Sequence, residues 1–96
     1  METLQLSEVF GSIGQATRME ILQVLAPLSK NAEIGMSAGK IAERLGLAAP
    51  TLSFHLKDMT LRHILMQKRV GREVYYRANL DLILKALEDL VIQLEK

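Results

Sequence analysis

The residues of this chain that could do chemistry are mostly basic side chains, and they are concentrated in the middle of the sequence. Residues 37–78 contain eight Lys or Arg against three Asp or Glu, a net charge of +5, whereas residues 1–36 and 79–96 each carry −2. The chain as a whole is almost neutral, at +1. This distribution predicts that a polyanion binds the central segment and is repelled by both ends.

Side chains suited to catalysis or metal binding are few. The chain has no cysteine, which excludes disulfides, thiol chemistry and cysteine-ligated metals. Its histidines, His55 and His63, are only two. The sequence also lacks a glycine-rich phosphate loop and a paired carboxylate arrangement. We therefore expect no enzyme activity, no cofactor and no metal site.

Two short helices are predicted to position the basic segment. Ser37 is a suitable N-cap for the first helix, and Gly46 is suited to end it in a left-handed conformation. The second helix begins near Pro50, which is tolerated in a first turn. Its expected inner face consists of Ala49, Leu52, Leu56 and Met59. Two such helices over about 37–62 are typical of a helix-turn-helix.

A β-hairpin with a basic tip is predicted over about 64–78. Its two strands, at 64–70 and 73–78, flank a Gly71-Arg72 turn. The cations near the tip either contact phosphates or the DNA minor groove, or form an ordinary charged surface turn. They are Lys68, Arg69 and Arg72.

The second helix of the pair carries the candidates for reading bases. Its outward face could place hydroxyl groups and an aromatic ring against base edges in the major groove. The candidates are Thr51, Ser53, Phe54 and His55. For Thr51 and Ser53 the residues alone favour an ordinary exposed or capping hydroxyl, and base contact is favoured only through the chain's resemblance to a known family. His55 lies at the edge of the buried face, where a hydrogen-bonded structural histidine is the favoured interpretation and a base or phosphate contact stays open.

Phosphate contacts are predicted from a second group of residues. Ser37 and Lys40 begin a helix, whose N-terminal amides can meet a phosphate. Lys57 is placed to reach the DNA backbone, although a solvated charge is the alternative. The same role is expected for the three cations of the hairpin tip. Together these two groups predict double-stranded DNA as the partner.

The two terminal helices, at about 4–13 and 80–95, are predicted to form a homodimer. The last helix would be about 24 Å long, and its apolar stripe is wider than one contact to its own domain requires. The alternative is a helix enclosed in the monomer's core, for which 96 residues leave little mass. The expected interface residues are Leu6, Phe10, Leu80, Ile83, Leu84, Leu87, Val91 and Leu94.

Length and composition predict one folded domain over residues 1–96. A single core serves about 100 to 150 residues, and 49% hydrophobic content is enough to fill one. No apolar run approaches the roughly 18 residues that span a bilayer. The acidic N-terminus does not resemble a secretory signal. We expect no membrane contact and a cytoplasmic location.

Four stretches together resemble the winged helix-turn-helix repressors of the ArsR/SmtB (arsenical-repressor) family. They are residues 15–22 (QATRMEIL), 37–46 (SAGKIAERLG), 49–57 (APTLSFHLK) and 70–77 (VGREVYYR). The resemblance implies a mainly α fold with a small β-hairpin, dimeric through its first and last helices. It also implies a repressor that leaves its operator when an inducer binds.

The chain departs from the family pattern in two places. His63 stands where many relatives have Gly before the first wing strand, and we expect it to adopt a positive φ. The family's cysteine metal sites are missing, and only Asp81 with Glu88 or Glu95 could contribute to its last-helix zinc site. A metal signal bound at those family sites is therefore not expected.

These observations predict a homodimeric repressor that binds an inverted-repeat operator and is released by an unidentified signal not bound through thiols. The effector could be a small molecule or a protein. Control by the repressor's own concentration fits equally well. The alternative function is a winged-helix module for protein interaction without an operator of its own.

Overall fold

The computed structural model describes residues 1–30 and 34–96, and in that part of the chain it contains five helices and a small antiparallel sheet. The helices are α1 (Thr3–Ile13), α2 (Ala16–Ser29), α3 (Ala38–Leu45), α4 (Ala49–Leu61) and α5 (Leu80–Leu94). The strands are β1 (Met36–Ser37), β2 (Leu65–Val70) and β3 (Glu73–Ala78). The predicted mainly α fold with a hairpin wing is confirmed.

The local signals for the helix-turn-helix act as the sequence predicts. The Ser37 hydroxyl accepts a hydrogen bond from the Lys40 amide at 3.3 Å and caps α3. Gly46 ends α3 at φ 64, a left-handed conformation that glycine adopts without steric cost. Pro50 lies in the first turn of α4. One residue of the expected inner face is a correction, because Ala49 at the start of α4 is exposed.

The sheet has a third strand that the sequence did not predict. The strand order is β1-β3-β2, with Met36 opposite Tyr76 and Ser37 opposite Tyr75. Helix α2 ends at Ser29 and β1 begins at Met36, and residues 31–33 between them lie outside the described chain. A strand of two residues is too short to show the alternation of apolar and polar side chains that predicts strands. Only its pairing with β3 identifies it.

Gly35, just before β1, is required by a close backbone approach. Its φ is +108, and a Cβ added there would lie 2.1 Å from the Tyr76 carbonyl oxygen. We expect Gly35→Ala to lower the free energy of unfolding by about 2 to 4 kcal/mol, because it combines strain with a clash. Chemical denaturation measures this loss.

The control for that prediction is Gly39→Ala in α3. A Cβ at Gly39 meets nothing within 4 Å, so this change is expected to be neutral or to stabilise by up to about 1 kcal/mol. Equal losses in the two variants would contradict the assignment of a special role to Gly35.

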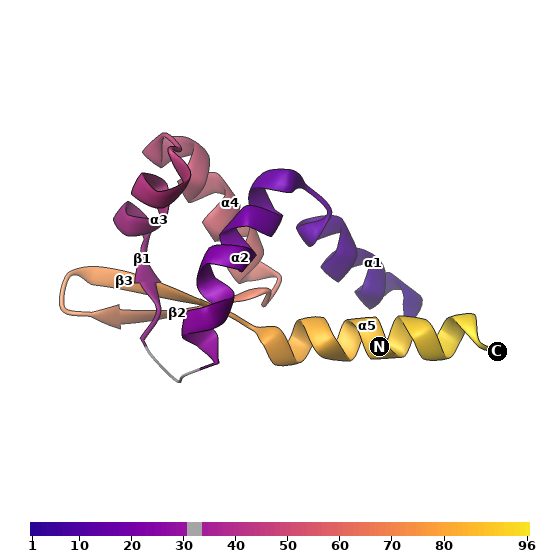
Figure 1. Cartoon of the computed structure of the whole chain (residues 1–96). Coiled ribbons are helices and arrows are strands. Elements are labelled where there is room, and N and C mark those ends of the chain that lie inside the picture. Colours follow the sequence, from indigo (N-terminus) through magenta and orange to yellow (C-terminus); the bar gives the residue numbers. More distant parts are fainter. Residues whose placement is uncertain (31–33) are drawn as a thin grey trace.

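The core joins the helix-turn-helix to the sheet and to α1 and α2. Helix α2 contributes Ile21 and Leu25, which are fully buried. The other fully buried large side chains are Ile41, Leu52, Leu56, Met59, Ile64 and Leu65. Helix α5 continues from β3 and points away from the hairpin, with α1 beside it, so the two terminal helices form one arm of the molecule (Figure 1).

Asn79 lies at the junction where the wing ends and α5 begins. Its Oδ1 accepts a hydrogen bond from the Leu82 amide at 3.3 Å and caps α5. Its Nδ2 donates to the His63 carbonyl at 2.9 Å, and its amide donates to the Ile64 carbonyl at 2.8 Å. His63 has φ 63, the positive value expected for it. One side chain thus links the α4–β2 turn, the end of the wing and the start of the arm.

No helix of the described chain has both the length and the apolar character needed to cross a bilayer.

Candidate nucleic-acid interface

The outer face of α4 is open to solvent along its length. Leu52, Leu56 and Met59 fix the helix against the core with exposures of 1% or less. On the opposite side Phe54 is 67% exposed and Leu61 is 70% exposed. The remaining outward residues are Pro50, Thr51, Ser53 and Lys57. The predicted orientation of this helix is therefore confirmed, and a large aromatic ring projects from it without cover in the protomer.

The hydroxyls at the start of α4 do not cap it. The N-cap residue is Ala48, which makes no side-chain capping bond. Thr51 and Ser53 lie within the helix and are exposed. A capping role is therefore excluded for both hydroxyls, while an ordinary exposed hydroxyl and a hydroxyl that contacts bases both agree with their exposure.

A groove connects α4 with the wing. It has a volume of about 200 Å³ and brings Ser53 and Lys57 of α4 next to Gln67 of β2 and Tyr76 of β3. Thr60 and Leu61 complete its lining. The sequence did not predict a role for Gln67 or Tyr76. Their position next to α4 depends on how the two strands pack against this helix, which no local sequence pattern indicates.

The basic residues of the wing are exposed as predicted. Lys68 pairs with Tyr75 and Arg69 with Val74 in the β2–β3 register, so the two adjacent cations project from opposite faces of the hairpin. Arg72 follows Gly71 in the turn, where Gly71 has φ 64. All three cations are exposed. The hairpin of β2 and β3 that carries them extends to the side of the molecule away from α5 (Figure 1).

Ser37 and Lys40 are not part of the α4 groove. They line a separate hollow of about 700 Å³ between α3, β1 and β3, together with Arg44, Glu73 and Tyr75. The Ser37 hydroxyl is already engaged as the cap of α3. Lys40 and Arg44, one turn apart on α3, are both exposed, and Arg44 is a neighbouring cation that the sequence did not single out.

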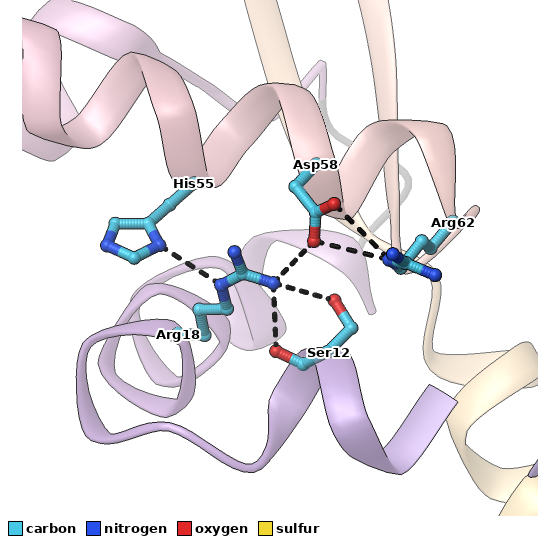
Figure 2. Close-up of polar contacts among 5 residues, drawn as sticks. All are labelled: Ser12, Arg18, His55, Asp58 and Arg62. Carbon is cyan, nitrogen blue, oxygen red and sulfur yellow. Dashed lines mark hydrogen bonds and ion pairs between the residues drawn. The ribbon is translucent and has the colours of Figure 1, made fainter. Parts of the chain in front are cut away.

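Arg18 of α2 joins three helices from a buried position (Figure 2). Its Nε donates to Nδ1 of His55 at 3.0 Å. Its Nη1 donates to the carbonyl and the hydroxyl of Ser12 at 3.2 and 3.1 Å and to Oδ2 of Asp58 at 2.5 Å. Arg62 Nε adds a contact to Asp58 at 3.3 Å. We call these five residues the Arg18 cluster.

The pKa values in the Arg18 cluster follow from burial and charge. Burial lowers the pKa of His55 below 6.5, and the positive charge of Arg18 lowers it further, while Asp58 opposes both. Burial alone would raise the pKa of Asp58. The hydrogen bond and charge of Arg18, aided by Arg62, outweigh it and bring the pKa below 3.8. At neutral pH the cluster therefore contains a neutral imidazole and a carboxylate.

His55 lies between helices rather than on the outer face of α4. It is 8% exposed, and its Nδ1 accepts the Arg18 bond. A base contact would have to use the other ring nitrogen. Its ring also meets Phe54 edge-on, with centroids 5.8 Å apart. The interpretation of His55 as a hydrogen-bonded structural histidine is confirmed.

The predicted dimer residues divide into two groups. Leu84, Leu87, Val91 and Leu94 of α5 are 48% to 75% exposed. Leu80, Ile83 and Phe10 are half-buried against their own core. Leu6 is a correction, because at 3% exposure it packs inside the protomer and leaves no surface for a partner. Leu4, 72% exposed on α1, is the apolar residue there that a partner could cover.

A family model described as a helix-turn-helix domain matches residues 13–63, which include α2, α3 and α4. The chain is 32% identical to the transcriptional repressor SdpR of Bacillus subtilis, with 77% of this chain and 76% of SdpR covered. An ArsR-like transcriptional regulator from Rhodococcus sp. RHA1 matches the structure with a TM-score of 0.77 and 29% identity, over 96% of this chain and 82% of its own. The chain belongs to the ArsR family of winged helix-turn-helix transcriptional regulators.

A further transcriptional regulator is also similar to this chain. The HTH-type transcriptional regulator KmtR of Mycobacterium tuberculosis is 30% identical over 88 residues, with 92% of this chain and 63% of KmtR covered. The chain thus spans less than two thirds of that relative.

Proposed function

We propose that this ArsR-family chain is a homodimeric transcriptional repressor that binds an inverted-repeat operator. The observation that carries the proposal is the outward face of α4, where exposed Phe54 and Lys57 adjoin a basic wing. A helix of this kind fits the major groove, and a wing on its flank fits the adjoining backbone or minor groove.

Base reading belongs to Thr51, Ser53 and Phe54 at the start of α4. Hydroxyl groups bond base edges, and the Phe54 ring suits a thymine methyl group. Lys57 and the wing cations Lys68, Arg69 and Arg72 contact phosphates. Ser37 and Lys40 act on the backbone from the start of α3, where Arg44 joins them.

Dimerisation through α5 supports the two-fold symmetry of the operator. The exposed apolar residues of α5 form an uncovered face that a second copy of the same helix would bury. A solved relative of the same fold, from Mycobacterium bovis, is described as homodimeric; it is 23% identical with a TM-score of 0.72, over 95% of this chain and 80% of its own. Two recognition helices about 34 Å apart would then enter successive major grooves.

Release from DNA requires a signal that binds the DNA-incompetent dimer more tightly than the competent one. The signal we propose does not use a thiol, because the chain has no cysteine. The protein acts by binding rather than by catalysis, and it acts in the cytoplasm, where its DNA is located.

The test is titration of promoter DNA with the purified protein at about 50 and 200 mM salt. Affinity should fall on the order of 10³-fold between the two concentrations, because neutralised phosphates release their counterions. Sequencing the genomic fragments that the protein retains identifies the operator. Absence of salt-sensitive DNA binding would instead favour the protein-interaction module.

A further inference from the structure

One buried guanidinium, that of Arg18, makes two side-chain contacts with α4 in addition to the apolar contacts that hold this helix on the core. His55 and Asp58 are three residues apart, so they lie on the same face of α4. Both bond Arg18, which also holds the C-terminal end of α1 through Ser12. Phe54 precedes His55 and Lys57 precedes Asp58 in the sequence. A rotation of α4 that broke the Arg18 contacts would therefore also turn the two residues assigned to DNA.

We propose that Arg18 is a positioning residue for DNA recognition, that it fixes the rotation of α4 by holding His55 and Asp58 together, and that protonation of His55 releases this hold and lowers DNA affinity. The inference rests on the proposed function. It adds a pH-dependent contact to it, remote from the outer face of α4.

The geometry requires arginine at position 18. The planar guanidinium presents one N–H to the imidazole and another to the carboxylate, in directions fixed by the fork. A lysine ammonium has its donors at a single point and cannot make both contacts in the same arrangement. Arg18→Lys therefore keeps the charge and removes the fork.

The geometry also requires a neutral His55. Nδ1 accepts the Arg18 bond, so the ring proton is on Nε2. Protonation would place an N–H of His55 against an N–H of Arg18 and bring two positive charges together. The charged groups facing the ring are Arg18 from α2 and Asp58 from α4, while α1 contributes the uncharged Ser12 to the cluster.

The sign of the pH effect follows from the state that needs the Nδ1 acceptor. In the proposal the DNA-bound protein keeps His55 neutral and so binds fewer protons than the free protein, which makes affinity fall as the pH decreases. The folded protein favours the neutral ring of His55, so the contact with Arg18 is complete above about pH 6.5. The contact is lost as the pH falls through the lower pKa of His55 in the folded state. Each unit by which the pKa of His55 is lower in the DNA-bound protein than in the free protein reduces affinity at low pH by up to about tenfold per protomer. A dimer would lose up to about 100-fold.

The experiment measures affinity for one DNA fragment by fluorescence anisotropy, at constant ionic strength, from about pH 8 to pH 5. We expect the wild-type affinity to fall as the pH decreases. His55→Asn should flatten the profile, because the amide oxygen accepts from Arg18 near the position of Nδ1 and does not titrate. Arg18→Lys should lower affinity at neutral pH on the order of tenfold and show no pH step.

His63→Asn is the matched control. His63 is the other histidine of the chain and is exposed, and asparagine tolerates its positive φ. This variant should keep the wild-type pH step. Thermal unfolding and dimer mass, measured for each variant at each pH, separate a change in DNA recognition from a loss of folding.

A pH step that persists in His55→Asn would overturn the inference. Loss of all binding in a folded, dimeric His55→Asn would also overturn it, because the amide oxygen keeps the Arg18 contact. If the wild type binds DNA without a pH step, the inference is overturned and the proposed function is not. Absence of DNA binding at every pH would defeat the proposed function and the inference with it.

Discussion

Leu87→Glu combined with Val91→Glu is expected to convert the protein to monomers and to lower operator affinity at least about 100-fold. Leu87 and Val91 are one turn apart on α5, 48% and 52% exposed, and they line a shallow hollow of about 420 Å³ with Glu88 and Ile92. In a two-fold dimer four added carboxylates would gather in a desolvated contact, which costs several kcal/mol. Monomers would also lose the gain from binding two half-sites at once.

Analytical ultracentrifugation measures the mass, and a titration with operator DNA measures the affinity. Met19→Glu is the control, because Met19 is also 48% exposed but lies on α2. It should leave both readouts unchanged. A double variant that remains dimeric would show that α5 does not form the contact between protomers.

Lys57→Ala combined with Arg72→Ala is expected to weaken DNA binding by on the order of 10²- to 10³-fold, equally for operator and unrelated sequences. Phosphate contacts carry no sequence information. Four would be lost per dimer, two from each protomer, so the slope of log affinity against log salt should decrease by about 3.6.

Phe54→Ala provides the contrast. It should change the preferred base at one position in each half-site, by about 1 to 3 kcal/mol, and leave the salt slope unchanged. Lys85→Ala serves as the charge control, because Lys85 lies on α5 in an ion pair with Asp89. A reduced slope in Lys85→Ala, or a loss of sequence preference in the Lys57 and Arg72 variant, would contradict the assignment of these roles.

Local patterns predicted most of the fold. The helix-turn-helix and the hairpin depend on residues close in sequence, such as Ser37, Gly46 and Gly71. The positive φ of His63 was expected from the family resemblance instead, because many relatives have Gly at that position. Strand β1 depends on its pairing with β3, a long-range contact that the periodicity of apolar residues in the sequence does not predict. The division of the α5 stripe into a core side and an open side depends on where α1 packs, which a helical wheel does not contain.

The position of Arg18 in the sequence indicates that its side chain is buried. Arg18 is three residues before Ile21 and seven before Leu25, so it falls on the buried stripe of α2. A charged residue on such a stripe requires a partner, because an unpaired buried charge is costly. The partners themselves, His55 and Asp58, lie 37 and 40 residues away, and only the fold brings them to Arg18.

The bonds of Asn79 have a mechanical consequence for a dimer. Because this side chain joins α5 to the α4–β2 turn at the base of the wing, we expect the arm and the wing to move together. Any adjustment in how two arms cross would therefore be passed to both wings with leverage from the length of α5. In such a dimer, the geometry at Asn79 would set the separation of the two wing tips, and with it the length of DNA between them.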